Sequence, residues 1–323
     1  MRILTAILFA LIAVGGALMF ITTTSDTVAR LEPAALAWLV LGMVLAAAIW
    51  LALVLTQDRF RARRWWPMTI AFLLTATIAV GVGLLANGPA ISWIQQRFGV
   101  EFAENFAASF AGAGNEEPLK AAAILATVVL FSRSLDRPAQ LFYVGAAAGL
   151  GFAVVENLHY GLTTALTHAD SDMAGVTMMV VARGITGLVM HWFWSACVGL
   201  GIGLLLWERG LLRRWIAGIA TIALGWGLHF FWNAAGVLPG EFITAFVVSA
   251  LVIVLVLAGL KRMEFRWFAE RMHGEVSDAR VSSMRSWWTR SRARRRTDAT
   301  RASQSELLTR ANRPGAPVPS AQA

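Results

Sequence analysis

Long apolar segments recur along most of the chain, and they constrain its fold more than any other feature. A helix of about 20 apolar residues crosses a bilayer, and eight segments approach that length between charged or Gly- and Pro-rich breaks. They cover roughly residues 3–22, 33–55, 68–85, 116–131, 141–160, 176–207, 215–237 and 242–260. With 57% hydrophobic and 15% charged residues, the sequence predicts an all-α, polytopic transmembrane helical bundle of about eight spans.

The segments suggest three regions. Residues 1–66 hold N-terminal transmembrane helices and an arginine-rich loop, residues 67–260 form the membrane core, and residues 261–323 form a basic, partly disordered tail. The first apolar segment follows Arg2, as in a signal peptide, but it is long for such a peptide and no clear cleavage site follows. We therefore interpret it as an uncleaved anchor.

Arginines gather in alternate loops and orient the bundle. The loops after the second, fourth and sixth segments contain Arg59, Arg61, Arg63 and Arg64, then Arg133 and Arg137, then Arg209, Arg213 and Arg214. Positive residues favour the cytoplasmic side. The pattern predicts a multi-pass protein of the cell membrane with both termini in the cytoplasm.

The tail holds 14 of the 28 basic residues. Aromatic residues lie among these arginines, namely Trp267, Phe268, Trp287 and Trp288. Such a stretch is typical of a segment that lies on anionic lipid, where each basic residue contributes about 1 kcal/mol. We expect lipid contact rather than nucleic-acid binding by Arg290–Arg296, and disorder from about Thr297.

Ionisable and amide residues inside the apolar segments are the candidate functional residues, because charges are costly in a bilayer. They are Glu116, Glu117 and Lys120, then Glu156 and Asn157, then Arg183 and His191, and finally His229 and Asn233. Glu116 and Glu117 lie four and three residues before Lys120, on one helix face. Asn115 and Pro118 are typical of a helix start, so we expect a helix to open at Glu116.

Helix depth predicts that these residues meet. Glu156 lies fifteen residues into its segment, or roughly 22 Å at about 1.5 Å per residue, and the same reasoning puts His191 and His229 between mid-membrane and the outer third. The glycines of these segments, among them Gly145, Gly149, Gly184, Gly199 and Gly227, would let helices approach closely.

Several common chemistries lack their signatures. Cys197 is the one cysteine, so the chain forms neither a disulfide framework nor a cysteine metal cluster. The sequence contains no HExxH, no GxSxG and no Gly-rich phosphate loop after a strand, which argues against zincin, serine-hydrolase and nucleotide-binding sites of the usual kind.

Four ordered motifs, NEEPLK, GLGFAVVENLHYG, RGITGLVMHWFWSACVGLGIG and HFFWN, resemble the PrsW family of intramembrane proteases, relatives of the CAAX-protease and bacteriocin-processing superfamily. The similarity covers about residues 65–260. The family's paired glutamates and basic residue match Glu116, Glu117 and Lys120, its FxxxE element matches Phe152 and Glu156, and its HxxxN/D element matches His229 and Asn233. Its arginine-then-histidine span corresponds to Arg183 and His191.

The resemblance implies an endopeptidase that cuts a single-pass membrane protein, such as an anti-sigma factor, near the outer face. Glu116 or Glu117 would act as general base on a water held by His191 or His229, and His229 and Asn233 would donate hydrogen bonds to the oxyanion. The supporting residues would be Lys120, Phe152, Glu156, Asn157 and Arg183.

A metal is the main alternative within this mechanism. Glu116, Glu156, His191 and His229 would make an acceptable zinc site, but HExxH is absent and Lys120 would repel a cation, so we favour no metal cofactor. Two other classes remain open. They are a proton- or cation-coupled transporter, in which Glu156, Arg183 and His191 form a path, and a non-catalytic member of the superfamily that binds a membrane protein.

Overall fold

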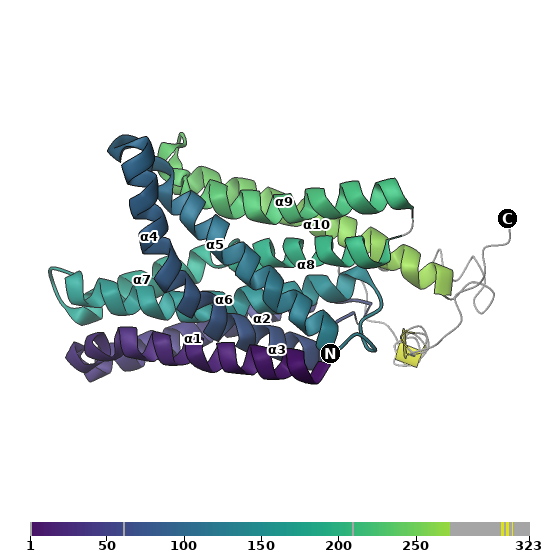
Figure 1. The fold of residues 1–323 in the computed structure, drawn as a ribbon, viewed down its shortest axis with the longest axis horizontal. Helices are drawn as coiled ribbons and strands as arrows, with labels where there is room; N and C mark the ends of the chain where they lie inside the picture. The colour runs from purple at the N-terminus through teal and green to yellow at the C-terminus, as the bar shows by residue number, and fades with distance from the viewer. Residues whose placement is uncertain are drawn as a thin grey trace, which may run out of the picture. The chain divides into compact units, whose positions relative to one another are not determined.

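The structure is a computed structural model that describes residues 2–60, 62–208, 210–271, 305, 306, 308, 309 and 312. This part of the chain is helical and contains no strand, which confirms the predicted all-α bundle. The helices are α1 (Arg2–Arg30), α2 (Pro33–Thr56), α3 (Trp65–Leu74), the π-helix η1 (Thr75–Ala79), α4 (Val80–Phe98), α5 (Val100–Leu130), α6 (Pro138–Thr167), α7 (Asp172–Thr186), α8 (His191–Trp207), α9 (Leu211–Asn233), the 3-10 helix η2 (Ala235–Val237) and α10 (Glu241–Arg271). In Figure 1, α1, α6, α8 and α9 run close to the horizontal and α4 crosses them steeply.

Seven helical stretches of the described chain are long and apolar enough to cross a membrane. They are Ile3–Arg30, Pro33–Thr56, Trp65–Phe98, Pro138–Thr167, Asp172–Trp207, Leu211–Asn233 and Glu241–Arg271. The chain is thus a multi-pass membrane protein. Of the eight predicted spans, the fourth is absent from this set. It belongs to α5, which is 31 residues long but carries charged residues along its length.

The predicted helix start at Glu116 is wrong. α5 begins at Val100, with Gly99 alone between it and the end of α4, so Glu116 lies in the middle of a long helix and Pro118 lies inside it. Proline removes one backbone hydrogen bond from a helix interior. Pro118 and Gly114, whose carbonyl loses that bond, both lie on the exposed side of α5. The residues before Glu116 are mostly Ala, Phe and Glu, which continue the helix upstream.

The predicted single span over 176–207 is also interrupted. α7 ends at Thr186 and α8 begins at His191, with a turn between them. The Trp50 ring occupies this break, because a Cβ at Gly187 would lie 2.1 Å from Trp50 Cζ2. The Trp50 indole N–H donates to the carbonyl of Gly184, 3.1 Å away, near the end of α7. Arg183 therefore lies in the last turn of α7, and His191 opens α8.

Close contact between α6 and α8 forms the centre of the bundle. A Cβ at Gly149 of α6 would lie 2.0 Å from the carbonyl oxygen of His191, and one at Gly199 of α8 would lie 2.1 Å from that of Leu141. These glycines let the two backbones approach, as predicted. Gly184 and Gly227 have no heavy atom within 4 Å of an added Cβ, so the prediction fails for them.

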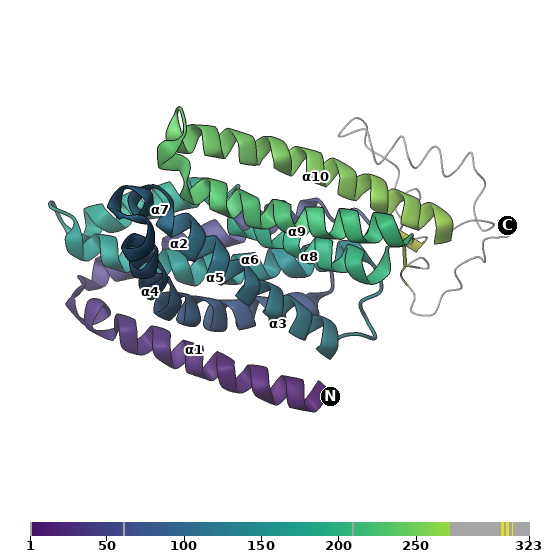
Figure 2. The ribbon, with the colours of Figure 1, turned by 45° about the horizontal axis from the view of Figure 1, so that its top comes forward.

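Both N-terminal helices pack on the same bundle. In α1, a Cβ at Gly16 would lie 2.4 Å from the carbonyl oxygen of Thr77 in η1, and α2 packs on α6 and α7. The side chain of Leu39 contacts Gly161 of α6, and Gly42 contacts Val180 of α7. The carboxylate of Asp172, in the first turn of α7, accepts a hydrogen bond from the backbone N–H of Glu32 at 2.9 Å. Figure 2 shows α1 along the lower edge of the bundle. Large apolar side chains are exposed along α1, α2 and α9, as expected of surfaces that face lipid.

The described residues within 56–62 and 254–323 form a second compact unit. Within it, the rings of Phe60 and Phe268 lie 6.0 Å apart, and the Asn312 amide donates to the Phe60 carbonyl at 3.2 Å. Several predicted features lie outside the described residues, namely Arg61, Arg209, Trp287, Trp288, Arg290–Arg296 and most of the segment that follows Thr297.

Candidate active site

Lys120 lies at the centre of a buried charged cluster. Its ammonium nitrogen is 2.9 Å from Glu117 Oε1 and 3.4 Å from Glu116 Oε2, and all three side chains project from one face of α5. Nζ also lies 3.3 Å from His191 Nδ1 and 3.7 Å from the centre of the Phe152 ring. The relative exposure of Lys120 is 0%, and that of Glu116 and Glu117 is 4% and 3%. The predicted grouping of Glu116, Glu117 and Lys120 is thus present in the structure.

His229 of α9 reaches both carboxylates. Its Nδ1 lies 2.9 Å from Glu117 Oε1, and its Nε2 lies 3.7 Å from Glu116 Oε2. A carboxylate accepts hydrogen bonds, so Nδ1 carries the hydrogen and donates it to Glu117. The Ser195 hydroxyl donates to the other oxygen of Glu117 at 3.5 Å. Both oxygens of Glu117 are therefore engaged by protein groups.

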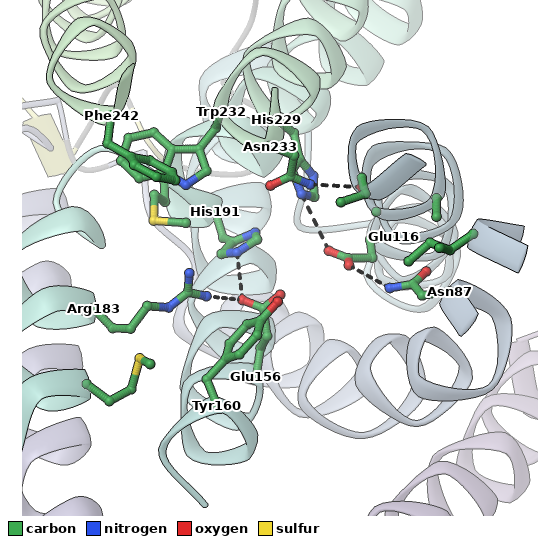
Figure 3. A pocket seen from close by; sticks show the side chains of 16 residues that line it. Asn87, Glu116, Glu156, Tyr160, Arg183, His191, His229, Trp232, Asn233 and Phe242 are labelled. Atoms are coloured by element: carbon green, nitrogen blue, oxygen red, sulfur yellow. Dashed lines mark hydrogen bonds and ion pairs between the residues drawn. The ribbon is translucent and has the colours of Figure 1, made fainter. Parts of the chain in front are cut away.

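His191 joins this cluster to a second one on α6 and α7. Since the Lys120 ammonium only donates, His191 Nδ1 accepts, and its Nε2 donates to Glu156 Oε2 at 2.9 Å. Arg183 also donates to Glu156 Oε2 and to Asn157 Oδ1. Figure 3 shows Arg183 and His191 converging on the Glu156 carboxylate. The structure thus brings together the α6, α7 and α8 residues that the sequence analysis singled out.

Aromatic rings fix the two imidazoles. The Trp194 ring stacks on His229 with centroids 4.5 Å apart and a 17° angle, and it meets His191 edge-on at 4.6 Å. Phe152 lies 4.9 Å from His191. Because Trp194 and Phe152 are buried, the rings have little freedom to turn, which keeps each nitrogen directed at its partner.

A cavity of about 450 Å³ borders this cluster. It has room for several waters, each of which takes about 30 Å³. The polar residues that line it are Asn87, Glu116, Glu156, Tyr160, Arg183, His191, His229 and Asn233 (Figure 3). Glu117 and Lys120 are not among its described lining residues, so Glu116 is the carboxylate of the pair that faces the open space.

Asn233 lies on the cavity wall. Its amide donates to the carbonyl of Ala108 on α5 at 3.2 Å. A Cβ at Gly112 would lie 2.7 Å from Asn233 Nδ2 and 3.7 Å from His229 Nε2, so the glycine lets α9 bring both residues to α5. The sequence predicted His229 and Asn233 on one helix face, and both do line the cavity.

The sequence analysis missed Asn87, Tyr160, Trp232 and Phe242, which also line the cavity. The Asn87 amide donates to Glu116 Oε1 at 3.2 Å, and the Tyr160 ring packs 4.6 Å from the Arg183 guanidinium. Asn87 lies two residues after the predicted third span of 68–85, but the structure continues that helical stretch to Phe98. Trp232 lies in the HFFWN motif between His229 and Asn233, but nothing in the sequence distinguishes Phe242 from other aromatic residues of the membrane helices.

The residues of the cluster fit a metal ion in part. Glu116, His191 and His229 offer ligand atoms within 4.8 Å of one another, and two histidines with a glutamate are a zinc donor set. The bond from His229 Nδ1 to Glu117 is the outer contact that commonly orients such a ligand. Glu156, the fourth predicted ligand, is not in this group. The Lys120 ammonium, close to Glu116 and His191, opposes a cation.

Comparison with known proteins bears on this cluster. A model of the PrsW family of intramembrane metalloproteases matches residues 63–260. No curated protein and no solved structure matches the chain. The matched segment contains all the predicted site residues and confirms the resemblance inferred from the four motifs. Since it covers more than half of the sequence, the chain belongs to the PrsW family of intramembrane metalloproteases.

Proposed function

We propose that the chain is an endopeptidase in which Glu116 activates a water for attack on a peptide bond of a single-pass membrane protein. One observation carries this assignment. Of the two adjacent glutamates, Glu116 lines the 450 Å³ cavity together with His229 and Asn233, whereas Glu117 is not among its described lining residues and is bonded to Lys120, His229 and Ser195. A general base needs an open side on which its water can sit.

In the proposed reaction, Glu116 takes a proton from the water as the water oxygen bonds to the carbonyl carbon. The tetrahedral intermediate carries its negative charge on the former carbonyl oxygen, where the Asn233 amide and a protonated His229 Nε2 would donate hydrogen bonds. When the carbon–nitrogen bond breaks, Glu116 returns the proton to the leaving nitrogen. The products are a new carboxyl terminus and a new amino terminus.

His229 is the better candidate of the two histidines for direct contact with the reacting groups. Its Nε2 lies 3.7 Å from Oε2 of Glu116, the proposed base, and His229 lines the cavity. Both nitrogens of His191 already face partners, Lys120 and Glu156. We therefore assign His191 to hold Lys120 and Glu156 in place, with Phe152, Asn157 and Arg183 as further supports.

A metal-dependent form of the same hydrolysis is the second candidate, and the donor group of Glu116, His191 and His229 favours it. These three residues would hold a zinc ion, which supplies a Lewis acid and a water that ionises near neutral pH. The Lys120 ammonium 3.4 Å from Glu116 favours the metal-free, glutamate-dependent form instead. We propose the metal-free form as the working mechanism.

The substrate and its topology rest on the sequence. With α5 crossing the bilayer as the predicted fourth of eight spans, the arginine-rich alternate loops support cytoplasmic termini in the cell membrane. The depth of Glu156 and His229 then supports cleavage near the outer face, as in an anti-sigma factor. The basic tail supports contact with anionic lipid, and we expect no nucleic-acid partner.

The test compares new protein N-termini in membranes from cells that express the wild-type chain, Glu116→Gln or Glu104→Gln. Glu104 is an exposed glutamate on the same helix, so Glu104→Gln is the matched control. We expect a fragment of a single-pass protein with wild type and Glu104→Gln and none with Glu116→Gln, each chain being equally inserted. A fragment that persists with Glu116→Gln contradicts the assignment of the base. No fragment with wild type under envelope stress would favour a transporter or a non-catalytic binding protein.

The purified chain and the substrate found in this way distinguish the two mechanisms. We expect cleavage to continue after treatment with a chelator, because Lys120 takes the place of a cation beside Glu116. Cleavage that stops with chelator and returns with added zinc would establish the metal-dependent form.

A further inference from the structure

We infer that Asn87 of α4 is a positioning residue that holds the Glu116 carboxylate in its reactive orientation, and that Asn115 in turn fixes the Asn87 amide. This inference rests on the proposed role of Glu116. Two hydrogen bonds connect α5 to α4 and α4 back to α5. Asn115 Nδ2 donates to Asn87 Oδ1 at 3.0 Å, and Asn87 Nδ2 donates to Glu116 Oε1 at 3.2 Å.

The donor and acceptor of each hydrogen bond follow from the chemistry of the side chains. A glutamate carboxylate accepts hydrogen bonds, so Asn87 must turn its NH2 group toward Glu116. Its carbonyl oxygen then points the other way and needs a donor, which the Asn115 amide supplies. Without Asn115, the Asn87 amide could turn over and present its oxygen to the carboxylate, which would repel it.

The two oxygens of Glu116 therefore have different neighbours. Oε1 accepts from Asn87, while Oε2 lies 3.4 Å from Lys120 Nζ and 3.7 Å from His229 Nε2. Figure 3 shows Asn87 and His229 on opposite sides of the carboxylate. This arrangement fixes the plane of the carboxylate and leaves Oε2 on the side of the histidine.

Packing by itself does not hold the end of the Glu116 side chain. Glu116 and Asn87 line both the 450 Å³ cavity and a second cavity of about 170 Å³. Gly83, one turn before Asn87, leaves further room, since a Cβ there would still lie 4.0 Å from Asn87 Nδ2 and from Glu116 Cγ. With open space on two sides, the carboxylate depends on its hydrogen bonds for orientation. A displacement of about 1 Å at a reacting group can lower a rate about a hundredfold.

The test measures kcat and KM for cleavage of the substrate identified above by the purified full-length chain in mixed micelles. Asn87→Leu keeps the side-chain size and removes the donor, and Asn87→Asp keeps the shape but offers oxygens alone. We expect both to lower kcat about 10- to 100-fold and to leave KM within about twofold of wild type, because Glu116 acts on the reacting water. Asn105→Leu is the matched control. The Asn105 amide bonds to the Glu101 carbonyl of its own helix, so we expect wild-type kinetics.

The decisive measurement is the double variant Asn87→Leu/Asn115→Leu. If Asn115 acts through Asn87, Asn115→Leu alone lowers kcat and the double variant is no slower than Asn87→Leu. If the two substitutions act independently, their reductions of kcat multiply in the double variant, and that result would overturn the inference. An unchanged kcat in the single variants, or a change confined to KM, would overturn it too. If Asn87→Leu does not fold, Asn115→Leu and Asn87→Asp provide the same comparison. If Asn87→Leu and Asn87→Asp cleave the substrate as well as wild type does, this inference is wrong and the proposed function still holds. If wild type itself does not cleave, both are wrong.

Discussion

Removal of the Lys120 charge tests how the buried cluster is stabilised. Lys120 is fully buried between two carboxylates that are themselves nearly inaccessible. Loss of one partner from a buried ion pair leaves an uncompensated charge and costs about 3–5 kcal/mol. We therefore expect Lys120→Met to lower the free energy of unfolding by this amount, a change of roughly a hundredfold to several thousandfold in the folded-to-unfolded ratio.

The assay is equilibrium unfolding of the purified chain in mixed micelles, with two comparisons. In Lys120→Met/Glu117→Gln the carboxylate nearest Lys120 also loses its charge, so we expect the double variant to recover about half of the loss or more. Arg213→Met is the matched control. Its guanidinium lies 3.6 Å from Glu208 and its side chain is 59% exposed, and such pairs contribute about 0–1 kcal/mol.

Two results would refute this reasoning. One is a loss below about 1 kcal/mol for Lys120→Met, which would mean that other groups stabilise the two charged carboxylates without Lys120. The other is a double variant that is no more stable than the single one, which would attribute the loss to packing against Phe152 rather than to charge.

Two further predictions concern the helices that position the site. Gly149→Ala places a Cβ 2.0 Å from the backbone oxygen of His191, so we expect it to lower the free energy of unfolding by about 1–3 kcal/mol and to reduce cleavage. The control Gly227→Ala has no atom within 4 Å of its Cβ and should be neutral or slightly stabilising. Equal unfolding free energies for the two variants would contradict the close contact between α6 and α8. Trp50→Phe keeps a ring at the α7–α8 break but removes the hydrogen-bond donor to Gly184. We expect the free energy of unfolding to fall by about 1 kcal/mol in the same assay, and an unchanged value would contradict this prediction.

Much of the fold could be predicted because helices that cross a membrane are long apolar segments, which are visible in the sequence. Apolar length identified most of the spans, and the cost of buried charge identified Glu116, Lys120 and His229 as neighbours. The helix boundaries were harder. Pro118 and Asn115 carry the local signals of a helix start, but packing in the bundle continues α5 through them.

The break between α7 and α8 could not be predicted for a related reason. The residues around Gly187 are apolar and compatible with one continuous helix, and the interruption coincides with a tryptophan from α2, more than a hundred residues earlier. Asn87 was missed because the predicted third span ends at residue 85, whereas the helical stretch continues to Phe98 and brings the Asn87 amide to Glu116.

The sequence by itself determined the membrane class, the residue types of the site and the i,i+3 and i,i+4 spacing that puts Glu116 and Glu117 beside Lys120. Helix geometry fixes such neighbours within one segment. The tertiary structure alone decided which carboxylate faces the cavity, because that depends on how side chains from other helices pack around the pair. Ser195 of α8 and His229 of α9 engage Glu117, whereas Glu116 accepts a hydrogen bond from Asn87 of α4 and lines the cavity.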